Sequence, residues 1–420
     1  MPSETGELLE HLFRQMSGKM TAHLTRVLGS ARLDQAEEIA QEAMLRALQT
    51  WPYQGVPENP PAWLFRTARN LALDQLRHEK LTERKHQELD APVTPAPDEP
   101  AGDLADDELR MIFLCCHPEI PREASIALSL KTVSGFSVRE IARAFLSEEA
   151  AIAQRLVRAK RHIRDRGIAL DLPGEADLRQ RMDAVLEVLY FMFNEGYAAH
   201  EGEDLIRRDL CFEALRLTQL IAASSMNSPR VHALAALMAL QAARLPARVD
   251  ALGDLVLLEN QDHRLWDQRL ISLGFHHFDL SIAGEEISEY HAQAAIAAEH
   301  IRGGMSGSMN WPAILRLYDQ LLEMTGSPVV ALNRAVAVGK VRGPETALAS
   351  IAPLEGSPAL REYHLLLAAR GHFLLDLDRR EAAANCFRAA LECRCSEPER
   401  RFLRKRLAEC ESVQASRPIG

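Results

Sequence analysis

Positively charged side chains are concentrated between Arg155 and Arg166, where Asp165 is the only acid. The bases in it are Arg155, Arg158, Lys160, Arg161, Arg164 and Arg166. Guanidinium and ammonium groups at this density neutralise phosphates, and arginine can also pair with the edge of a guanine base. The chemistry open to this segment is therefore the binding of a polyanion rather than catalysis.

Two short helices joined by a tight turn must position these bases, and residues 137–166 carry the signals for them. Ser137 and Glu140 have the spacing of a capping box, and Ser147 is expected to cap the second helix. Apolar residues recur at helical spacing in both segments, namely Ile141, Ala142, Phe145, Ile152, Leu156 and Ile163. The pattern predicts a helix-turn-helix, whose second helix lies in the major groove of DNA.

The chain as a whole is acidic, in contrast to this basic segment. The 420 residues carry a net charge of -10, which argues against non-specific binding of nucleic acid by the whole surface. The length suggests about two to four domains. Seven cysteines at irregular spacing indicate reduced thiols. Because no apolar run resembles a signal peptide or a membrane span, we expect a soluble, cytoplasmic protein with no membrane contact.

Apolar residues recur every three or four positions almost throughout, so the sequence predicts an all-α fold. Residues 89–108 contain four prolines, seven acids and no base, which predicts a flexible acidic linker. A second boundary is expected at Pro173-Gly174, which should stop the basic helix. The predicted domains are residues 1–88, the helix-turn-helix domain at 109–172, and a large helical domain at 175–420.

The large domain contains two segments that look alike, Leu332–Ile351 and Leu366–Leu391. Their offset of roughly 34–36 residues is the period of tetratricopeptide-type helix hairpins. Small residues on the first helix of each hairpin face small residues on the second. The sequence therefore predicts a helical-repeat, tetratricopeptide-like domain.

The first domain should contain two amphipathic helices. In the segment AEEIAQEAMLRAL, which starts at Ala36, we expect Ile39, Ala43 and Leu45 to face a core. Its outer face would carry Glu37, Glu38, Gln41 and Glu42. A second helix begins near Pro60-Pro61. It exposes Arg66, Arg69, Asn70 and Arg77, while Trp63 suits either a core position or stacking on a base.

These segments together resemble a known family. The order AEEIAQEAMLRAL, PAWLFRTARNLALDQLR, linker and basic helix-turn-helix is similar to bacterial RNA polymerase sigma factors of the sigma-70 family. It most resembles the extracytoplasmic-function (ECF) type, which keeps regions 2 and 4. Residues 189–217, 327–344 and 363–371 resemble the ECF subgroup with a large tetratricopeptide-like C-terminal extension.

The resemblance implies partners and roles. RNA polymerase core would contact the first domain through the clamp helices of its largest subunit, and the second through its flap region. The residues implied at the clamp contact are Glu38, Gln41 and Glu42. Those implied at the promoter -10 element are Trp63, Arg66, Arg69, Asn70 and Arg77. Those implied at the -35 element are Ala150, Gln154, Arg155, Arg158, Lys160 and Arg161.

The expected function is a sigma factor that directs promoter recognition and DNA melting under the control of its own C-terminal domain. The helical surface of that domain is also a candidate site for a further protein partner. It would have no catalytic chemistry and no cofactor. The alternative is a helix-turn-helix regulator that acts without core polymerase and carries a ligand- or protein-sensing helical domain. The family usually has a glycine in the turn, whereas this chain has Ala144–Glu149, AFLSEE.

Metal binding and a ligand site are weaker interpretations. Cys115-Cys116-His117 and Cys393-x-Cys395 lack complementary pairs at zinc-finger spacing, so buried thiols and no metal are expected. Histidines at 263, 276, 277, 291 and 300 fall on different predicted helices. Gly196 could be a left-handed helix stop, and a ligand or interdomain role for Glu195 stays open.

Overall fold

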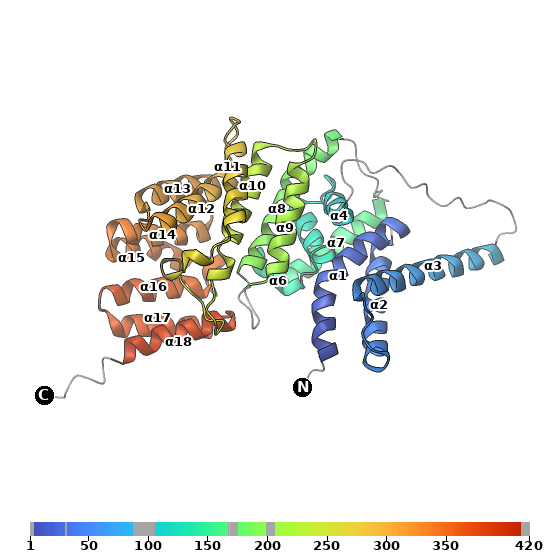
Figure 1. Cartoon of the computed structure of the whole chain (residues 1–420), viewed down its shortest axis with the longest axis horizontal. Helices are drawn as coiled ribbons and strands as arrows, with labels where there is room; N and C mark the ends of the chain where they lie inside the picture. Colours follow the sequence, from blue (N-terminus) through green and yellow to red (C-terminus); the bar gives the residue numbers. More distant parts are fainter. Residues whose placement is uncertain are drawn as a thin grey trace. The chain divides into compact units, whose positions relative to one another are not determined.

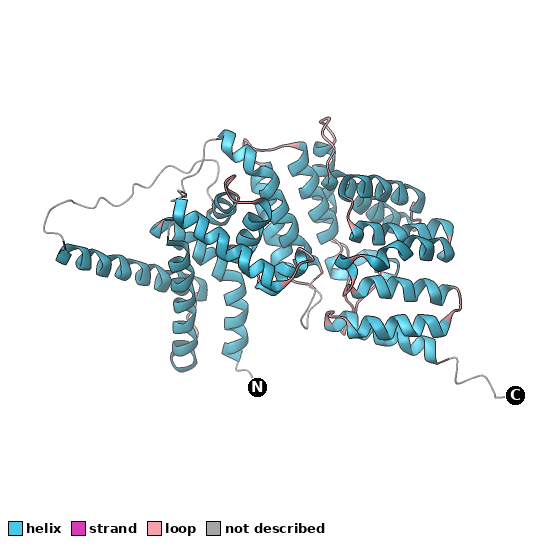
Figure 2. Cartoon of the chain, turned by 180° about the vertical axis from the view of Figure 1, so that it is seen from behind, coloured by secondary structure: helices cyan, strands magenta, loops and turns pink. Residues whose placement is uncertain are grey.

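The computed structural model describes residues 4–29, 32–86, 106–166, 168, 175–198 and 206–412. Helices and loops account for all of these residues, and no strand occurs among them (Figure 2). The predicted all-α class is confirmed. The chain divides into two compact units, residues 1–188 with 224–226, and residues 189–223 with 227–420.

The described residues of the first unit form seven complete helices and the first part of an eighth. They are α1 (Glu4–Leu28), α2 (Leu33–Gln54), α3 (Pro60–His86), α4 (Asp107–Cys115), α5 (Arg122–Thr132), α6 (Val138–Ala144), α7 (Glu149–Arg166) and α8 (Glu175–Tyr197). α7 ends at Arg166, before the predicted stop at Pro173-Gly174, which lies outside the described residues. Residues 89–105 of the predicted linker also lie outside them.

Helices α1, α2 and α3 share one apolar core. Its members are spaced at three and four residues, as in Met20 and Leu24 of α1 and Ala36, Ala40 and Ala43 of α2. α3 starts as predicted at Pro60. The side chain of Asn59 accepts a hydrogen bond from the backbone N–H of Ala62 at 3.1 Å and so caps this helix.

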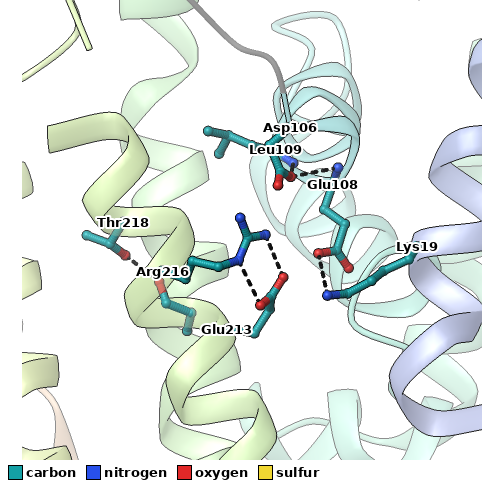
Figure 3. A network of polar contacts seen from close by, with 8 residues as sticks. Lys19, Asp106, Glu108, Leu109, Glu213, Arg216 and Thr218 are labelled. Atoms are coloured by element: carbon teal, nitrogen blue, oxygen red, sulfur yellow. Dashed lines mark hydrogen bonds and ion pairs between the residues drawn. The ribbon is translucent and has the colours of Figure 1, made fainter. Parts of the chain in front are cut away.

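A second face of α1 packs against α4 and α5. At Gly18 the approach is so close that an added Cβ would lie 1.5 Å from the carbonyl oxygen of Val133. Lys19 pairs with Glu108 at 3.6 Å, next to the cap that Asp106 makes on the N–H groups of Glu108 and Leu109 (Figure 3). A helix thus begins inside the segment predicted as linker, because its last acids cap α4 and pair with α1.

Asp107 strengthens this contact. Its carboxylate lies 3.4 Å from His23 and 3.4 Å from Arg26, both on α1. The hydrogen bond with His23, together with the charge of Arg26, lowers the pKa of Asp107 below its ordinary value. The carboxylate is therefore held ionised where it meets the cations of α1.

The thiols of Cys115 and Cys116 are buried between α4 and α5. Their sulfurs lie 3.7 Å from the hydroxyl of Thr132 and 3.8 Å from that of Ser129. Burial raises the pKa of Cys115 to about 11 and that of Cys116 to about 12, so both are protonated core groups. Within the described ranges, no group of three or more potential ligands could hold a metal ion.

The second unit continues as a succession of helices (Figure 1). They are α9 (Arg208–Ala222), α10 (Pro229–Ala242), α11 (Gln268–Ser281), α12 (Glu289–Ser306), α13 (Trp311–Thr325), α14 (Pro328–Arg342), α15 (Pro344–Ile351), α16 (His364–Asp376), α17 (Arg380–Glu392) and α18 (Glu397–Glu411). None of the described helices combines the length and apolar character that crossing a bilayer requires.

Two successive hairpins, α14–α15 and α16–α17, coincide with the predicted repeats. In the first helix of each, a glycine faces an aromatic ring. A Cβ on Gly339 would lie 2.8 Å from Phe373, and one on Gly371 would lie 2.9 Å from Phe387. Small residues face each other in the first hairpin, where Gly339 also approaches the Cβ of Ala347, but the prediction is wrong for the second, because Gly371 faces the ring of Phe387. In both hairpins the glycine allows close helix packing.

The prediction for Gly196 is wrong. It is not a left-handed helix stop but lies inside α8, and its φ is not positive. An added Cβ would come within 2.8 Å of the backbone nitrogen of Cys211 in α9. The glycine is thus explained by the close approach of the start of α9, which the local sequence does not reveal. Glu195, beside it, is buried.

One pair of histidines was not expected to be close. His232 of α10 and His277 of α11 stack, with their Nδ1 atoms 2.9 Å apart. Burial lowers the pKa of both, that of His277 to about 4, so the pair is neutral near pH 7. This contact has the features of a packed, uncharged helix junction.

Candidate nucleic-acid interface

The turn between α6 and α7 is built by local hydrogen bonds. Ser137 and Glu140 form the predicted capping box, with the backbone N–H of Ser137 donating to the Glu140 carboxylate at 2.6 Å. Leu146 takes a positive φ of 49°. The N–H groups of Leu146 and Ser147 then bond to the carbonyls of Arg143 and Ala142, which is a Schellman motif. Leu146 therefore occupies the conformation that glycine usually supplies in such a turn.

The predicted cap at Ser147 is wrong. α7 begins at Glu149, and the N–H groups of Ala151 and Ile152 bond to the carbonyl of Glu148. Glu148 is therefore the N-cap residue, because the Schellman bonds hold Ser147 in the preceding turn.

Replacing Ser137 and Ser147 with alanine, one at a time, should show that only Ser137 caps a helix. Ser137→Ala should lower the free energy of unfolding by about 1 kcal/mol, because an orphan N–H of α6 loses its acceptor. Ser147→Ala is the matched control and should change it by less than about 0.5 kcal/mol. Thermal and urea unfolding followed by circular dichroism would measure both. Equal losses in the two variants would contradict this assignment of caps.

Helix α7 has one buried face and one exposed face. Ile152, Leu156, Ala159 and Ile163 are buried. At 100° per residue, the centre of the opposite face falls on a single row of exposed residues. The exposed residues of this face up to Arg161, which we call the outer row, are Ala150, Ala153, Gln154, Val157, Arg158 and Arg161. Arg164 and Asp165 continue the face beyond it, and Asp165 lies 3.4 Å from Arg161. The outer row contains four of the residues expected at the -35 element.

Val157 and Ala153 of the outer row were missed by the sequence reasoning, which attended to polar side chains. Val157 is 67% exposed although it is apolar and β-branched. Its spacing of three from Gln154 and four from Arg161 is the signal that could have found it.

The other two residues expected at the -35 element, Arg155 and Lys160, lie at the edges of this face, and each forms an ion pair with acidic side chains. Arg155 meets Glu123 at 2.9 Å. Lys160 lies 2.9 Å from Asp34 and 2.7 Å from Glu37, both on α2. Burial alone would lower the pKa of Lys160, but its hydrogen bonds to the two carboxylates raise it above its ordinary value. Lys160 is thus a charged link between α7 and α2.

On α2, the residues expected at the polymerase contact share an exposed face. Glu38, Gln41 and Glu42 are all exposed. Leu45 was predicted to face the core, and this is wrong, because it is 50% exposed and lies on the same stripe. Leu48 is exposed beside it. The stripe therefore has an acidic part and an apolar part, whereas the sequence indicated only the first.

On α3, Arg66, Arg69, Asn70 and Arg77 are exposed and share one face at helical spacing. Trp63 is only partly buried, and its ring packs edge-to-face on that of Trp51 at 5.5 Å. The contacts of Trp63 therefore support a core position rather than stacking on a base.

Tyr53 is the exposed aromatic residue of this region and was missed by the sequence reasoning. It lies near the end of α2 and is 89% exposed. It precedes the loop to α3, and Pro52 and Gly55 around it are the sequence signal that this end of the helix is open to solvent.

Comparisons with known proteins follow the same division of the chain. The family described as sigma-70 region 2 matches residues 12–82, and sigma-70 region 4 matches residues 110–163. A family of unknown function, DUF6596, matches residues 181–282. An uncharacterised protein from Rhizobium meliloti (strain 1021) is 40% identical over 381 residues, covering 89% of this chain and 90% of the relative. No solved structure matches the chain significantly.

Proposed function

This chain belongs to the sigma-70 family, and we propose that it binds RNA polymerase core and directs it to promoters as an ECF-type factor. Sigma-70 regions 2 and 4 serve promoter recognition in this family. The observation that carries the proposal is the match of both regions, in order, to parts of the chain whose helices expose basic and acidic faces. The chain would act without catalytic chemistry or a cofactor, in the cytoplasm.

Core polymerase would dock on the exposed stripe of α2. Glu38, Gln41 and Glu42 would meet basic groups of the clamp helices, and Leu45 would supply the apolar contact beside them. An apolar centre with charged residues around it is the usual composition of a protein interface. The proposal is supported by the exposure of all four side chains.

Promoter DNA would contact α3 and α7. The four polar residues of α3 would hold the melted strand of the -10 element, and Tyr53 would offer a ring for an unstacked base. Ala150, Gln154, Arg158 and Arg161 of α7 would face the major groove of the -35 element. Arg155 and Lys160 lie at its edges, where each would reach a phosphate only by exchanging the carboxylates that now hold it.

The helical region after residue 175 would control this activity. It comprises more than half of the chain, and helical-repeat domains present extended surfaces suited to protein partners. We propose that it regulates initiation through the two sigma regions or through polymerase.

Charge reversal on α2 tests the proposal. Glu38→Lys and Glu42→Lys should each weaken binding to purified core polymerase by about ten-fold, because an opposed charge in the interface becomes a like charge. Binding would be measured by fluorescence anisotropy with the labelled full-length chain, and run-off transcription from a cognate promoter should fall in parallel.

The matched control is Glu285→Lys with Glu286→Lys, which reverses two exposed acids in the second unit. This control should bind core as the wild type does. Tight binding of a promoter duplex by the wild-type chain in the absence of core, with no detectable core binding, would instead favour the regulator that acts without polymerase.

A further inference from the structure

Val157 is not needed to hold α7 in the fold. The helix packs through Ile152, Leu156, Ala159 and Ile163, and Val157 points away from them, 67% exposed. A β-branched residue at an exposed helix position buries little area and has a lower helix propensity than alanine. Neither packing nor local stability therefore explains a valine here.

The neighbours of Val157 define the surface to which it belongs. Gln154 lies one turn before it and Arg161 one turn after it, with Arg158 alongside. Val157 is thus the one large apolar side chain of the outer row, with the small Ala153 one turn before it and polar or basic side chains on its other sides. Since the N-terminal half of a recognition helix contacts base edges, Val157 would meet a base rather than a phosphate.

Only one group on the base edges of the major groove matches an aliphatic side chain. Thymine carries a 5-methyl group there, whereas the other bases present hydrogen-bond donors and acceptors. A valine pressed against such a donor or acceptor would remove its water without replacing the hydrogen bond, which costs free energy. The same valine against the methyl group buries apolar area on both sides.

We infer that Val157 is a specificity-determining residue that selects thymine at one position of the upstream promoter element through the 5-methyl group. The inference rests on the proposed function, since it assigns one base contact within the duplex that α7 would bind. Gln154 and Arg158 would contact the neighbouring bases by hydrogen bonds, and Val157 would add the one apolar contact in the set.

The test removes the methyl group from DNA and leaves base pairing unchanged. A duplex is first selected from a random pool by the full-length chain bound to core polymerase. Each thymine of its upstream element is then replaced, one at a time, with deoxyuridine. Wild-type affinity should fall by about four-fold at one position, the value of one buried methyl group.

Two variants assign that loss to the right side chain. Val157→Ala should lose most of the difference between the thymine and uridine duplexes, because the shorter side chain leaves the methyl group largely uncovered. Arg161→Ala should bind both more weakly and keep the difference between them. Circular dichroism should show that both variants keep wild-type helicity, as expected for exposed positions.

The outcomes distinguish a failure of the Val157 contact from a failure of the proposed function. A duplex that binds tightly but is insensitive to uridine at every position overturns the role of Val157 and leaves the proposed function standing. The same holds if Val157→Ala keeps the wild-type sensitivity. If no duplex is selected with core polymerase present, the proposed function itself fails, and the role of Val157 falls with it.

Discussion

Gly18→Ala should destabilise the first unit by about 3 kcal/mol, although alanine is ordinarily the better helix former. Gly18 lies inside α1, and its added Cβ would be 1.5 Å from the oxygen and 2.5 Å from the carbon of the Val133 carbonyl. Both are backbone atoms, so no side-chain rotation can relieve the overlap. The face of α1 that meets α5 must move away.

The loss of stability should be confined to the part of the first unit where α1 meets α4 and α5. The core shared by α1, α2 and α3 lies on another face of α1 and should persist. The pairs that Lys19 and His23 make with α4 should break, because they belong to the displaced face. Hydrogen exchange should therefore accelerate in α1, α4 and α5, while the melting temperature falls by about 6–12 °C.

Gly356→Ala is the matched control for this substitution. An added Cβ at Gly356 would meet no atom within 4 Å, and the residue does not have a positive φ. It should therefore leave the melting temperature unchanged within about 2 °C. A Gly18→Ala protein that melts like the control would show that α1 and α5 do not approach each other closely in solution.

In the double variant Arg158→Glu and Arg161→Glu, the affinity for promoter DNA should fall on the order of 100-fold or more. Both side chains are exposed on the outer row, and Arg158 makes no ion pair with any residue that the structure describes. Each reversal removes a favourable contact and adds repulsion with phosphates. Binding of a promoter duplex by the complex with core polymerase, followed across salt concentrations, would measure the loss.

Two comparisons make this prediction specific. Arg316→Glu with Arg361→Glu carries the same change in net charge on exposed arginines of the second unit and should bind DNA as the wild type does. Arg155→Ala should have a smaller effect than Arg158→Ala, since Arg155 is already engaged with Glu123. Normal core binding with lost transcription is expected for the double reversal. Wild-type transcription in that variant would exclude α7 as the upstream reader.

The sequence alone determined the elements whose signals are local. Apolar spacing of three and four residues predicted the all-α class, and the Ser137–Glu140 spacing predicted a capping box that the structure contains. The repeated hairpins were likewise predicted from two segments of similar pattern. The apolar spacing and the capping box depend on residues within about one helical turn of each other, so their physical causes are present in the sequence itself.

Only the tertiary structure decided which faces stay exposed and where helices approach closely. Gly196 follows an apolar helix as a stop would, yet it serves the approach of α9. The apolar spacing of α7 already places Val157 opposite its buried face, but only the structure shows that the residue stays 67% exposed. In both cases the deciding factor is where other helices lie, and a local pattern carries no information about which surfaces meet.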